Sequence, residues 1–364
     1  MQISVLDPFF QTALFTSFFM ALVIFSAKKD LKPHDMNHSH TNELKGVAIL
    51  MVLFSHIGYF LFSDHTFLYP LSVAGGVGVN IFLFLSGFGL TSSEIKSNKP
   101  ILHFYFKRLR NIFIPMWLTL TSVLLLDAHI LNKTYSLHTI LQGVLGFFPN
   151  SDIDSAINSP LWYFTLILFY YLIFPLAYIR NKPYLSSLII LLTGFLITRL
   201  DLPVSKDVLK LYQLHYLAFP LGMAFANAYQ KKQIIKLKDY VVKHTSSWVV
   251  SYISYFLILI LSFLFAYTAI HSNIGKSVFA EQITSMFTML SLVLIFLIKD
   301  VQSDLLIILG KYSYEIYLIQ WPLLYRFDLI YNHTPAFLGT FLYILFFFVI
   351  GFVLNKFVKH YHSV

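Results

Sequence analysis

A single histidine lies deep in an apolar run and is preceded, eleven residues earlier, by a lysine. Lys45 and His56 belong to the segment NELKGVAILMVLFSHIGYF. In one α-helix eleven residues make about three turns, so both side chains share a face about 16 Å apart along the axis. Lys45 could bind phosphate groups at the mouth of a site while the His56 imidazole acts as a base deeper inside. A lysine that fixes orientation and a histidine bonded to a neighbouring helix explain the same spacing.

A second segment is rich in glycine and contains one serine. The run GGVGVNIFLFLSGFGL, residues 75–90, begins with glycines and is interrupted at Ser86. Small residues let helices approach closely, and the first turn of a helix can hold an anion or an oxyanion. A serine nucleophile of the G-x-S-x-G type is not supported, because Phe84 stands where that pattern needs glycine. Simple helix packing and a role for Ser86 beside a base both remain open.

Basic side chains gather just before another apolar run. In FYFKRLRNIFIPMW, residues 104–117, they are Lys107, Arg108 and Arg110. Arginine presents a planar fork of donors that suits phosphate, so a phosphorylated ligand such as coenzyme A could bind here. A stripe that contacts lipid head groups has the same composition.

Other polar residues are weaker candidates. One predicted loop could hold a metal ion, although a hydrophilic loop is the simpler interpretation; its residues are His34, Asp35, His38 and His40. His215 could be a second polar residue on the wall of a site, or only a packed histidine. Asp152 and Asp154 either solvate a loop or orient a sugar.

The elements that must position these residues are membrane-spanning helices. The 364 residues are 57% hydrophobic and only 12% charged, which is too little polar surface for a soluble chain of this size. The net charge of +9 is explained by basic loops that fix membrane orientation, so no nucleic-acid partner is expected. The absence of cysteine excludes disulfides, zinc thiolates and cysteine nucleophiles.

We predict about eleven transmembrane helices. The apolar runs lie near 9–26, 44–62, 73–92, 111–130, 160–179, 184–200, 212–229, 247–270, 282–299, 304–325 and 337–358. The first run lacks the basic start of a secretory signal and is followed by lysines, so we expect a retained helix with its N-terminus outside. Alternating loops then place most basic residues, and the C-terminus, in the cytoplasm, with the longest outer loop at about 131–159.

Several motifs, taken in order, resemble those of the acyltransferase-3 family of integral membrane O-acyltransferases, from about Asn42 to Trp321. They are the Lys45-to-His56 helix, GVGVNIFLFLSGFGL, FYFKRLRNIFIP, SPLWYFTLILFYYLIFPL and LGKYSYEIYLIQWPLL. Three positions depart from the family pattern. Asn80 stands where aspartate is common, Asn111 interrupts an Arg-x-x-Arg pair, and Gln320 replaces a common histidine.

The resemblance implies an all-α polytopic membrane protein with a ten-helix core. Residues 1–41 would then be an additional N-terminal helix and cytoplasmic loop, and 42–364 the acyltransferase domain. The implied partners are acetyl-CoA as acyl donor, a surface or lipid-linked glycan as acceptor, and the lipids of a bacterial inner membrane. No metal ion is expected. The implied site residues are His56 and Ser86 for catalysis; Lys45, Arg108 and Arg110 for the donor; and Asn80, Trp162, Tyr314 and Gln320 for the substrate.

The function that we expect from this resemblance is O-acetylation of a cell-surface polysaccharide, such as lipopolysaccharide O-antigen or capsule. His56 would take the proton of a sugar hydroxyl as it attacks the thioester, or would itself be acylated in a ping-pong variant. Two alternatives belong to other classes. One is a transporter or flippase for a lipid-linked glycan, and the other is a membrane partner that hands the acyl group to a separate transferase.

Overall fold

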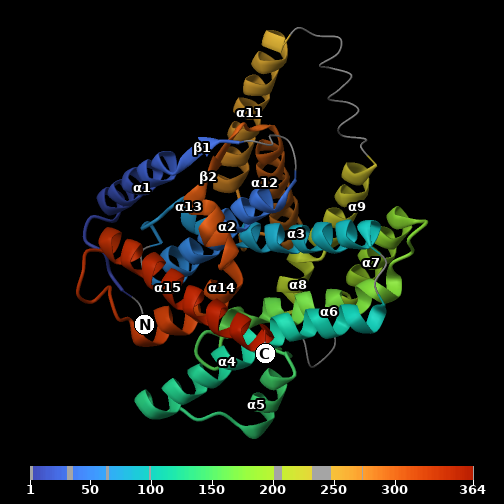
Figure 1. Ribbon diagram of the computed structural model, residues 1–364. Helices are drawn as coiled ribbons and strands as arrows, with labels where there is room; N and C mark the ends of the chain where they lie inside the picture. The colour runs from blue at the N-terminus through green and yellow to red at the C-terminus, as the bar shows by residue number, and fades with distance from the viewer. Residues whose placement is uncertain are drawn as a thin grey trace.

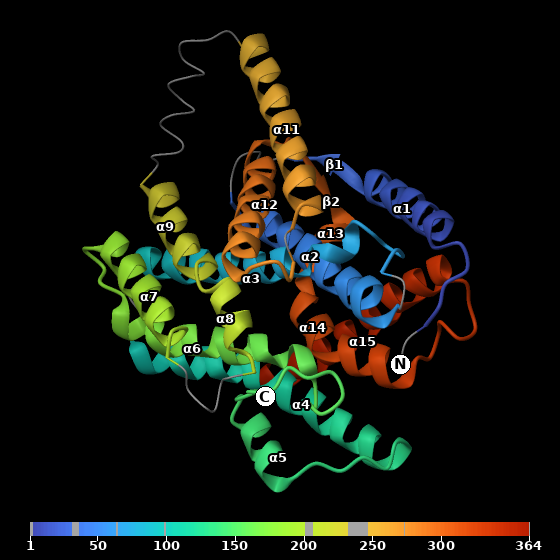
Figure 2. The ribbon, with the colours of Figure 1, turned by 180° about the vertical axis from the view of Figure 1, so that it is seen from behind.

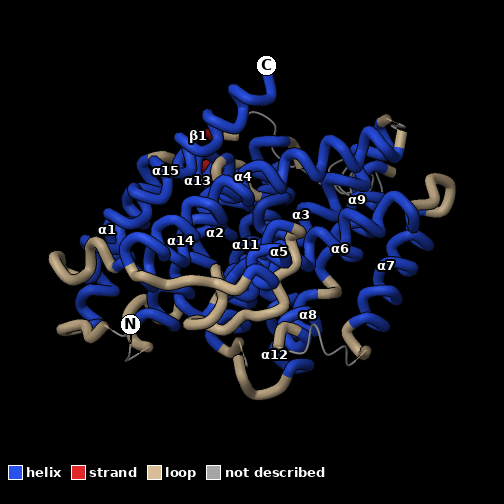
Figure 3. Tube along the Cα trace, turned by 90° about the horizontal axis from the view of Figure 1, so that it is seen from below, coloured by secondary structure: helices blue, strands red, loops and turns tan. Residues whose placement is uncertain are grey.

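The structure is a computed structural model, and it describes residues 3–30, 36–62, 65–97, 100–200, 207–231, 247–272 and 274–363. Helices make up about three quarters of this part of the chain, and its only strands are two short ones (Figure 1, Figure 3). The prediction of an all-α polytopic membrane protein is therefore confirmed. The basic residues predicted in the loop near 232–243 lie outside the described residues, as do His34 and Asp35.

Each of the predicted apolar runs is helical. Among the described residues, eight helices are long and apolar enough to cross a membrane on their own. They are α1 (Pro8–Phe25), α2 (His38–Ser55) with its extension η1 (His56–Leu61), α3 (Gly75–Lys96), α4 (Ile101–Ile130), η3 (Ser159–Leu161) with α6 (Trp162–Ala177), α11 (Ser247–Ile270), α12 (Val278–Ile298) and α15 (Ala336–Ser363).

The other predicted runs are shorter or broken helices. They are α7 (Pro183–Ile197); α8 (Leu209–His215) followed by α9 (Ala218–Gln230); and α13 (Asp304–Lys311) followed by α14 (Ser313–Pro322) and η5 (Leu323–Phe327). Two further short helices are η2 (Leu71–Val73) and α5 (Leu137–Val144). The long helix α11 extends beyond the rest of the bundle and packs along α12 (Figure 2).

Two helix crossings are so close that only glycine fits. A Cβ atom on Gly310 of α13 would lie 1.7 Å from the Asn42 carbonyl oxygen of α2. A Cβ atom on Gly222 of α9 would lie 2.0 Å from the Phe84 carbonyl oxygen of α3. Close approach of this kind is how small residues hold membrane helices together. The two crossings fix α2 and α3, which carry Lys45, Asn80 and Ser86 of the predicted site.

Proline residues release backbone carbonyls that tyrosine and asparagine side chains then bind. Pro322 has no N–H for the Leu318 carbonyl four residues earlier, and Asn158 Nδ2 donates to that oxygen at 2.9 Å. Pro220 similarly frees the Tyr216 carbonyl, which accepts from Tyr170 Oη at 3.0 Å. A carbonyl left without a donor in lipid would be costly, so these bonds stabilise the broken helices.

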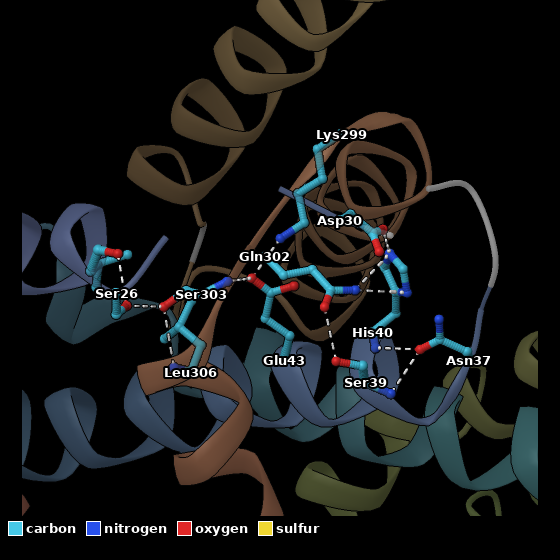
Figure 4. Close-up of polar contacts among 11 residues, drawn as sticks. Ser26, Asp30, Asn37, Ser39, His40, Glu43, Lys299, Gln302, Ser303 and Leu306 are labelled. Carbon is cyan, nitrogen blue, oxygen red and sulfur yellow. Dashed lines mark hydrogen bonds and ion pairs between the residues drawn. The ribbon is translucent and has the colours of Figure 1, made fainter. Parts of the chain in front are cut away.

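A buried polar network joins α1 to the core at the Lys45 end of α2 (Figure 4). Strand β1 (Ala27–Lys29) pairs antiparallel with β2 (Val301–Ser303). Glu43 of α2 accepts from the Ser303 amide and forms an ion pair with Lys299, each at 2.7 Å. His40 pairs with Asp30 at 2.7 Å. The N-terminal helix α1 is thus attached to α2 and to the start of α13 by specific contacts as well as by helix packing.

Candidate functional site

A cavity of about 700 Å³ opens between α2, α3, α4, α6 and α14. Four of its lining side chains are cationic: Lys45, Arg108, Lys311 and Lys359. Among the described residues no Asp or Glu lines it. Lys45 and Arg108 are close enough to repel each other electrostatically. Cations that converge without a carboxylate are stabilised when an anion binds between them.

Helix periodicity places the cavity wall on α2. His38, Asn42 and Lys45 line the cavity at spacings of four and three residues, which is one face of an α-helix. Asn42 Nδ2 also contacts His38 Nδ1 at 2.8 Å, which ties two of these side chains together. The same face continues one turn after another to His56, eighteen residues beyond His38.

Aromatic side chains position the other predicted residues of the cavity. Ser86 Oγ and Tyr171 Oη are 2.7 Å apart, and the Arg108 guanidinium lies 5.7 Å from the centroid of the Tyr171 ring. Tyr314 Oη donates to the Ile112 carbonyl of α4 at 2.6 Å. The structure therefore brings Lys45, Ser86, Arg108 and Tyr314 together.

Arg110 lies elsewhere. Two residues on a helix are separated by about 200°, so Arg110 faces away from the side on which Arg108 lines the cavity. It is exposed, and its guanidinium lies 5.8 Å from the centroid of the Phe106 ring. Sequence reasoning also missed Lys311 and Lys359, because lysines at helix ends look like ordinary orientation signals until the fold brings them to the cavity.

His56 lies at the end of α2, where the helix widens into the π-helical turn η1. Its ring contacts Trp321 edge-on, with centroids 4.8 Å apart and planes at 60°. Gly75 packs against Ser55, the residue before His56: a Cβ atom on Gly75 would lie 2.7 Å from Ser55 Oγ. His56 Nδ1 is buried and has no hydrogen-bond partner among the described residues. His56 does not line the cavity, whose wall on α14 reaches Tyr317.

Gln320 lies beside His56. Its side chain is fully buried, and neither its amide nitrogen nor its amide oxygen has a hydrogen-bond partner in the described chain. Gln320 shares a face of α14 with Ser313 and Tyr317, seven and three residues earlier, and both of these line the cavity.

Asn80 and Trp162 lie in a separate cluster around His215. His215 Nδ1 is 2.8 Å from Asn80 Oδ1, and Asn80 Nδ2 donates to Ser285 Oγ at 3.0 Å. Ser285 Oγ itself donates to the Gln282 carbonyl, so the asparagine amide has one orientation and His215 Nδ1 carries the hydrogen. Trp162 stacks on the His215 ring with centroids 5.4 Å apart.

The segment predicted as the long loop 131–159 is bound tightly to the end of α14. Buried Asp127 forms an ion pair with Arg326 and accepts from Tyr135 Oη at 2.7 Å. Arg326 Nη2 donates to the Ala156 and Ile157 carbonyls. The loop is thus held beside Trp321 and the His56 end of α2. Asp152 and Asp154 both lie in this loop, and Asp154 accepts from Tyr325 Oη at 3.1 Å.

Two histidines of the loop near residue 38, which was expected to be simply hydrophilic, are described and have other partners. His38 contacts Asn42, and His40 pairs with Asp30. Within the described ranges no group of three or more His, Asp or Glu side chains is arranged to hold a metal ion.

Comparison with known proteins agrees with this architecture. The model of the acyltransferase-3 family, described as an acyltransferase domain, matches residues 42–356. An O-acetyl transferase of Shigella phage Sf6 is 28% identical over 295 residues, covering 76% of this chain and 81% of the phage protein. No protein of solved structure matches.

Proposed function

Because the chain belongs to the acyltransferase-3 family, whose model covers residues 42–356, we propose that it is an O-acetyltransferase with a glycan acceptor. The acetyl group would come from acetyl-CoA, and the acceptor would be a hydroxyl of a cell-surface polysaccharide such as lipopolysaccharide O-antigen or capsule. The name of the phage relative supports acetyl as the group transferred. The observation that carries the proposal is the cationic cavity at one end of the helix that bears His56.

The cavity suits the donor. Lys45 and Arg108, together with Lys311 and Lys359, would bind the phosphates of coenzyme A. The negative charge of the phosphates would then neutralise the positive charge of these four side chains. The tyrosines and phenylalanines of the wall offer an apolar path for the pantetheine arm. Arg110 remains a candidate for the entry of the donor, since it is exposed on the same helix as Arg108.

His56 would be the general base. It would accept the proton of the attacking sugar hydroxyl as the new ester bond forms and the thioester C–S bond breaks, and return that proton to the coenzyme A sulfur. Ser86 lies about 16 Å along α3 from Gly75, the residue beside Ser55. We therefore assign Ser86 to the donor cavity, and keep His56 as the group that touches the reacting atoms.

The cavity also supports one orientation of the protein in its membrane. Acetyl-CoA is made in the cytoplasm, so the end of the bundle that carries Lys45 would face the cytoplasm. Lys359 of α15 lines the same cavity, which supports a cytoplasmic C-terminus. A bacterial inner membrane with the glycan presented from the far side is the setting that this arrangement fits, with Asn80 and Trp162 on the acceptor side.

The decisive experiment measures O-acetyl content of surface glycans in three strains: one with the intact chain, one with His56→Ala at equal membrane level, and a deletion strain. We expect acetyl to be lost in the last two. Binding of acetyl-CoA to the purified His56→Ala protein should survive, because His56 lies outside the cavity. Unchanged acetylation in all three strains would instead favour a different acyl group or a transporter.

A further inference from the structure

We propose that Gln320 is a catalytic residue that donates its amide N–H to the acyl carbonyl oxygen, and so stabilises the oxyanion formed during transfer. This inference rests on the proposed acetyl transfer and adds a second group at its reacting centre. It starts from unsatisfied polar atoms in the core of the bundle.

The side chain of Gln320 is buried beside His56, with which it interacts. Its Nε2 and Oε1 atoms, and Nδ1 of His56, make no hydrogen bond of full geometry within the described residues. A buried polar group without a partner costs about 1–3 kcal/mol. Three such atoms side by side, within the apolar part of a membrane protein, indicate that a polar ligand completes the arrangement when the protein works.

Two helix faces lead from the donor cavity to this place. On α2 the wall formed by His38, Asn42 and Lys45 continues to His56. On α14 the wall formed by Ser313 and Tyr317 continues to Gln320, three residues and about 4.5 Å beyond Tyr317. A thioester that advances along both faces would meet the imidazole and the amide together.

Neighbouring side chains fix the positions of His56 and Gln320. Trp321, the next residue after Gln320, packs its ring against His56. Asn158 binds the Leu318 carbonyl that Pro322 leaves free, which fixes the end of α14. A donor held rigidly in a dry site is the arrangement that stabilises developing charge most, because little reorganisation is needed when the charge appears.

The chemistry then balances. The sugar oxygen bonds to the acyl carbon, and its proton passes to His56. Negative charge moves to the carbonyl oxygen, where the Gln320 Nε2–H donates to it. The C–S bond breaks as the carbonyl re-forms, and the sulfur takes the proton from His56. Gln320 gains and loses no proton at any stage.

An alternative role for Gln320 is to orient His56 by accepting a hydrogen bond from the imidazole. A negative charge at position 320 would have opposite effects on the two roles. A carboxylate at position 320 would hold the imidazole at least as well as an amide does, but it would repel an oxyanion and offer no hydrogen. Gln320→Glu therefore separates a donor to the oxyanion from a positioning residue, and Gln320→His restores an N–H donor.

The test uses the purified full-length protein with acetyl-CoA and native membranes that supply the glycan. For Gln320→Leu and Gln320→Glu we expect kcat to fall about 10²- to 10³-fold with KM for acetyl-CoA little changed. Gln320→His should recover most of the loss. Full activity in Gln320→Leu, or in Gln320→Glu, would overturn the assignment. An intact protein that transfers no acetyl would defeat the proposed function instead.

A spectroscopic measurement on bound acetyl-CoA tests the hydrogen bond from Gln320 without requiring acetyl transfer. It also compares two variants, so the result does not depend on the folding of one of them. Infrared difference spectra of bound acetyl-CoA carrying a ¹³C-labelled carbonyl should show the C=O band shifted to lower frequency, as expected for a hydrogen-bonded carbonyl. The shift should vanish in Gln320→Leu and persist in His56→Ala. A band at the same frequency in intact protein and Gln320→Leu, with acetyl-CoA bound to both, would show that Gln320 does not touch the acyl group.

Discussion

The indole of Trp321 packs against the imidazole of His56, with ring centroids 4.8 Å apart and planes at 60°. Tyr325 stacks on the same indole at 5.1 Å, and Phe60 meets it edge-on at 5.9 Å. Trp321 is only 3% exposed. The histidine is therefore packed against an aromatic group whose members come from η1, α14 and η5.

Trp321→Ala should release the ring of His56. We expect transfer to fall by at least about tenfold, because a misplaced base loses alignment with the hydroxyl. The empty space should also lower the free energy of unfolding by about 3–5 kcal/mol. Trp321→Phe keeps an aromatic edge and should lose less on both counts. Steady-state kinetics and thermal unfolding in detergent measure the two effects, and equal activity of both variants with intact protein would contradict the prediction.

Lys45→Ala should weaken donor binding more than chemistry. Removal of one of the cavity cations is expected to raise KM for acetyl-CoA about tenfold, since charge-assisted bonds contribute about 1.5–3 kcal/mol. Lys107→Ala is the matched control. Lys107 belongs to the same basic segment as Arg108, but it is exposed and does not line the cavity. An unchanged KM in Lys45→Ala would remove this residue from the donor site.

Lys311 and Lys359 should contribute to the same binding. Lys311→Ala and Lys359→Ala are each expected to raise KM for acetyl-CoA several-fold and to weaken its dependence on salt concentration, because fewer charges then attract the phosphates. Titration of acetyl-CoA at low and at moderate ionic strength measures both quantities. Variants that bind acetyl-CoA like the intact chain at both ionic strengths would confine the donor to Lys45 and Arg108.

The sequence predicts the wall of the cavity on single helices better than it predicts contacts between helices. The period of α2 relates Lys45 to His56, and the basic segment contains Arg108. The apolar run predicts a helix that begins near residue 111, but α4 begins at Ile101. Arg108 and Arg110 therefore both lie within the helix, on different sides of it. The charged first turns of that helix are amphipathic, and a search for apolar runs passes over them.

Contacts between distant segments could not be predicted from one sequence. His215 and Asn80 are separated by 135 residues, and their bond depends on how α3, α8 and α12 pack. His215 was predicted only as a possible wall residue because nothing in its neighbourhood along the chain reveals Asn80. Lys359 likewise reaches the cavity only through the packing of α15.

Asn80→Leu should remove the acceptor that fixes the His215 tautomer and leave Ser285 and His215 with unsatisfied groups. A loss of about 1–3 kcal/mol in the free energy of unfolding is expected. Asn80→Asp keeps an acceptor for His215 Nδ1 and should be closer to the intact chain. Thermal unfolding of the two variants measures the difference. Equal melting temperatures for the leucine and aspartate variants would show that the bond carries no stability.

Arg326→Leu tests the buried ion pair that holds the loop beside the His56 end of α2. Asp127 is fully buried, so the variant would leave its carboxylate without a countercharge, which typically costs about 3–5 kcal/mol. The double variant Asp127→Leu with Arg326→Leu removes that charge and should be more stable than Arg326→Leu alone. Binding of acetyl-CoA should survive in both, because neither residue lines the donor cavity. If the double variant unfolds below the single one, Asp127 stabilises the loop even without the arginine, through the hydrogen bond that it accepts from Tyr135.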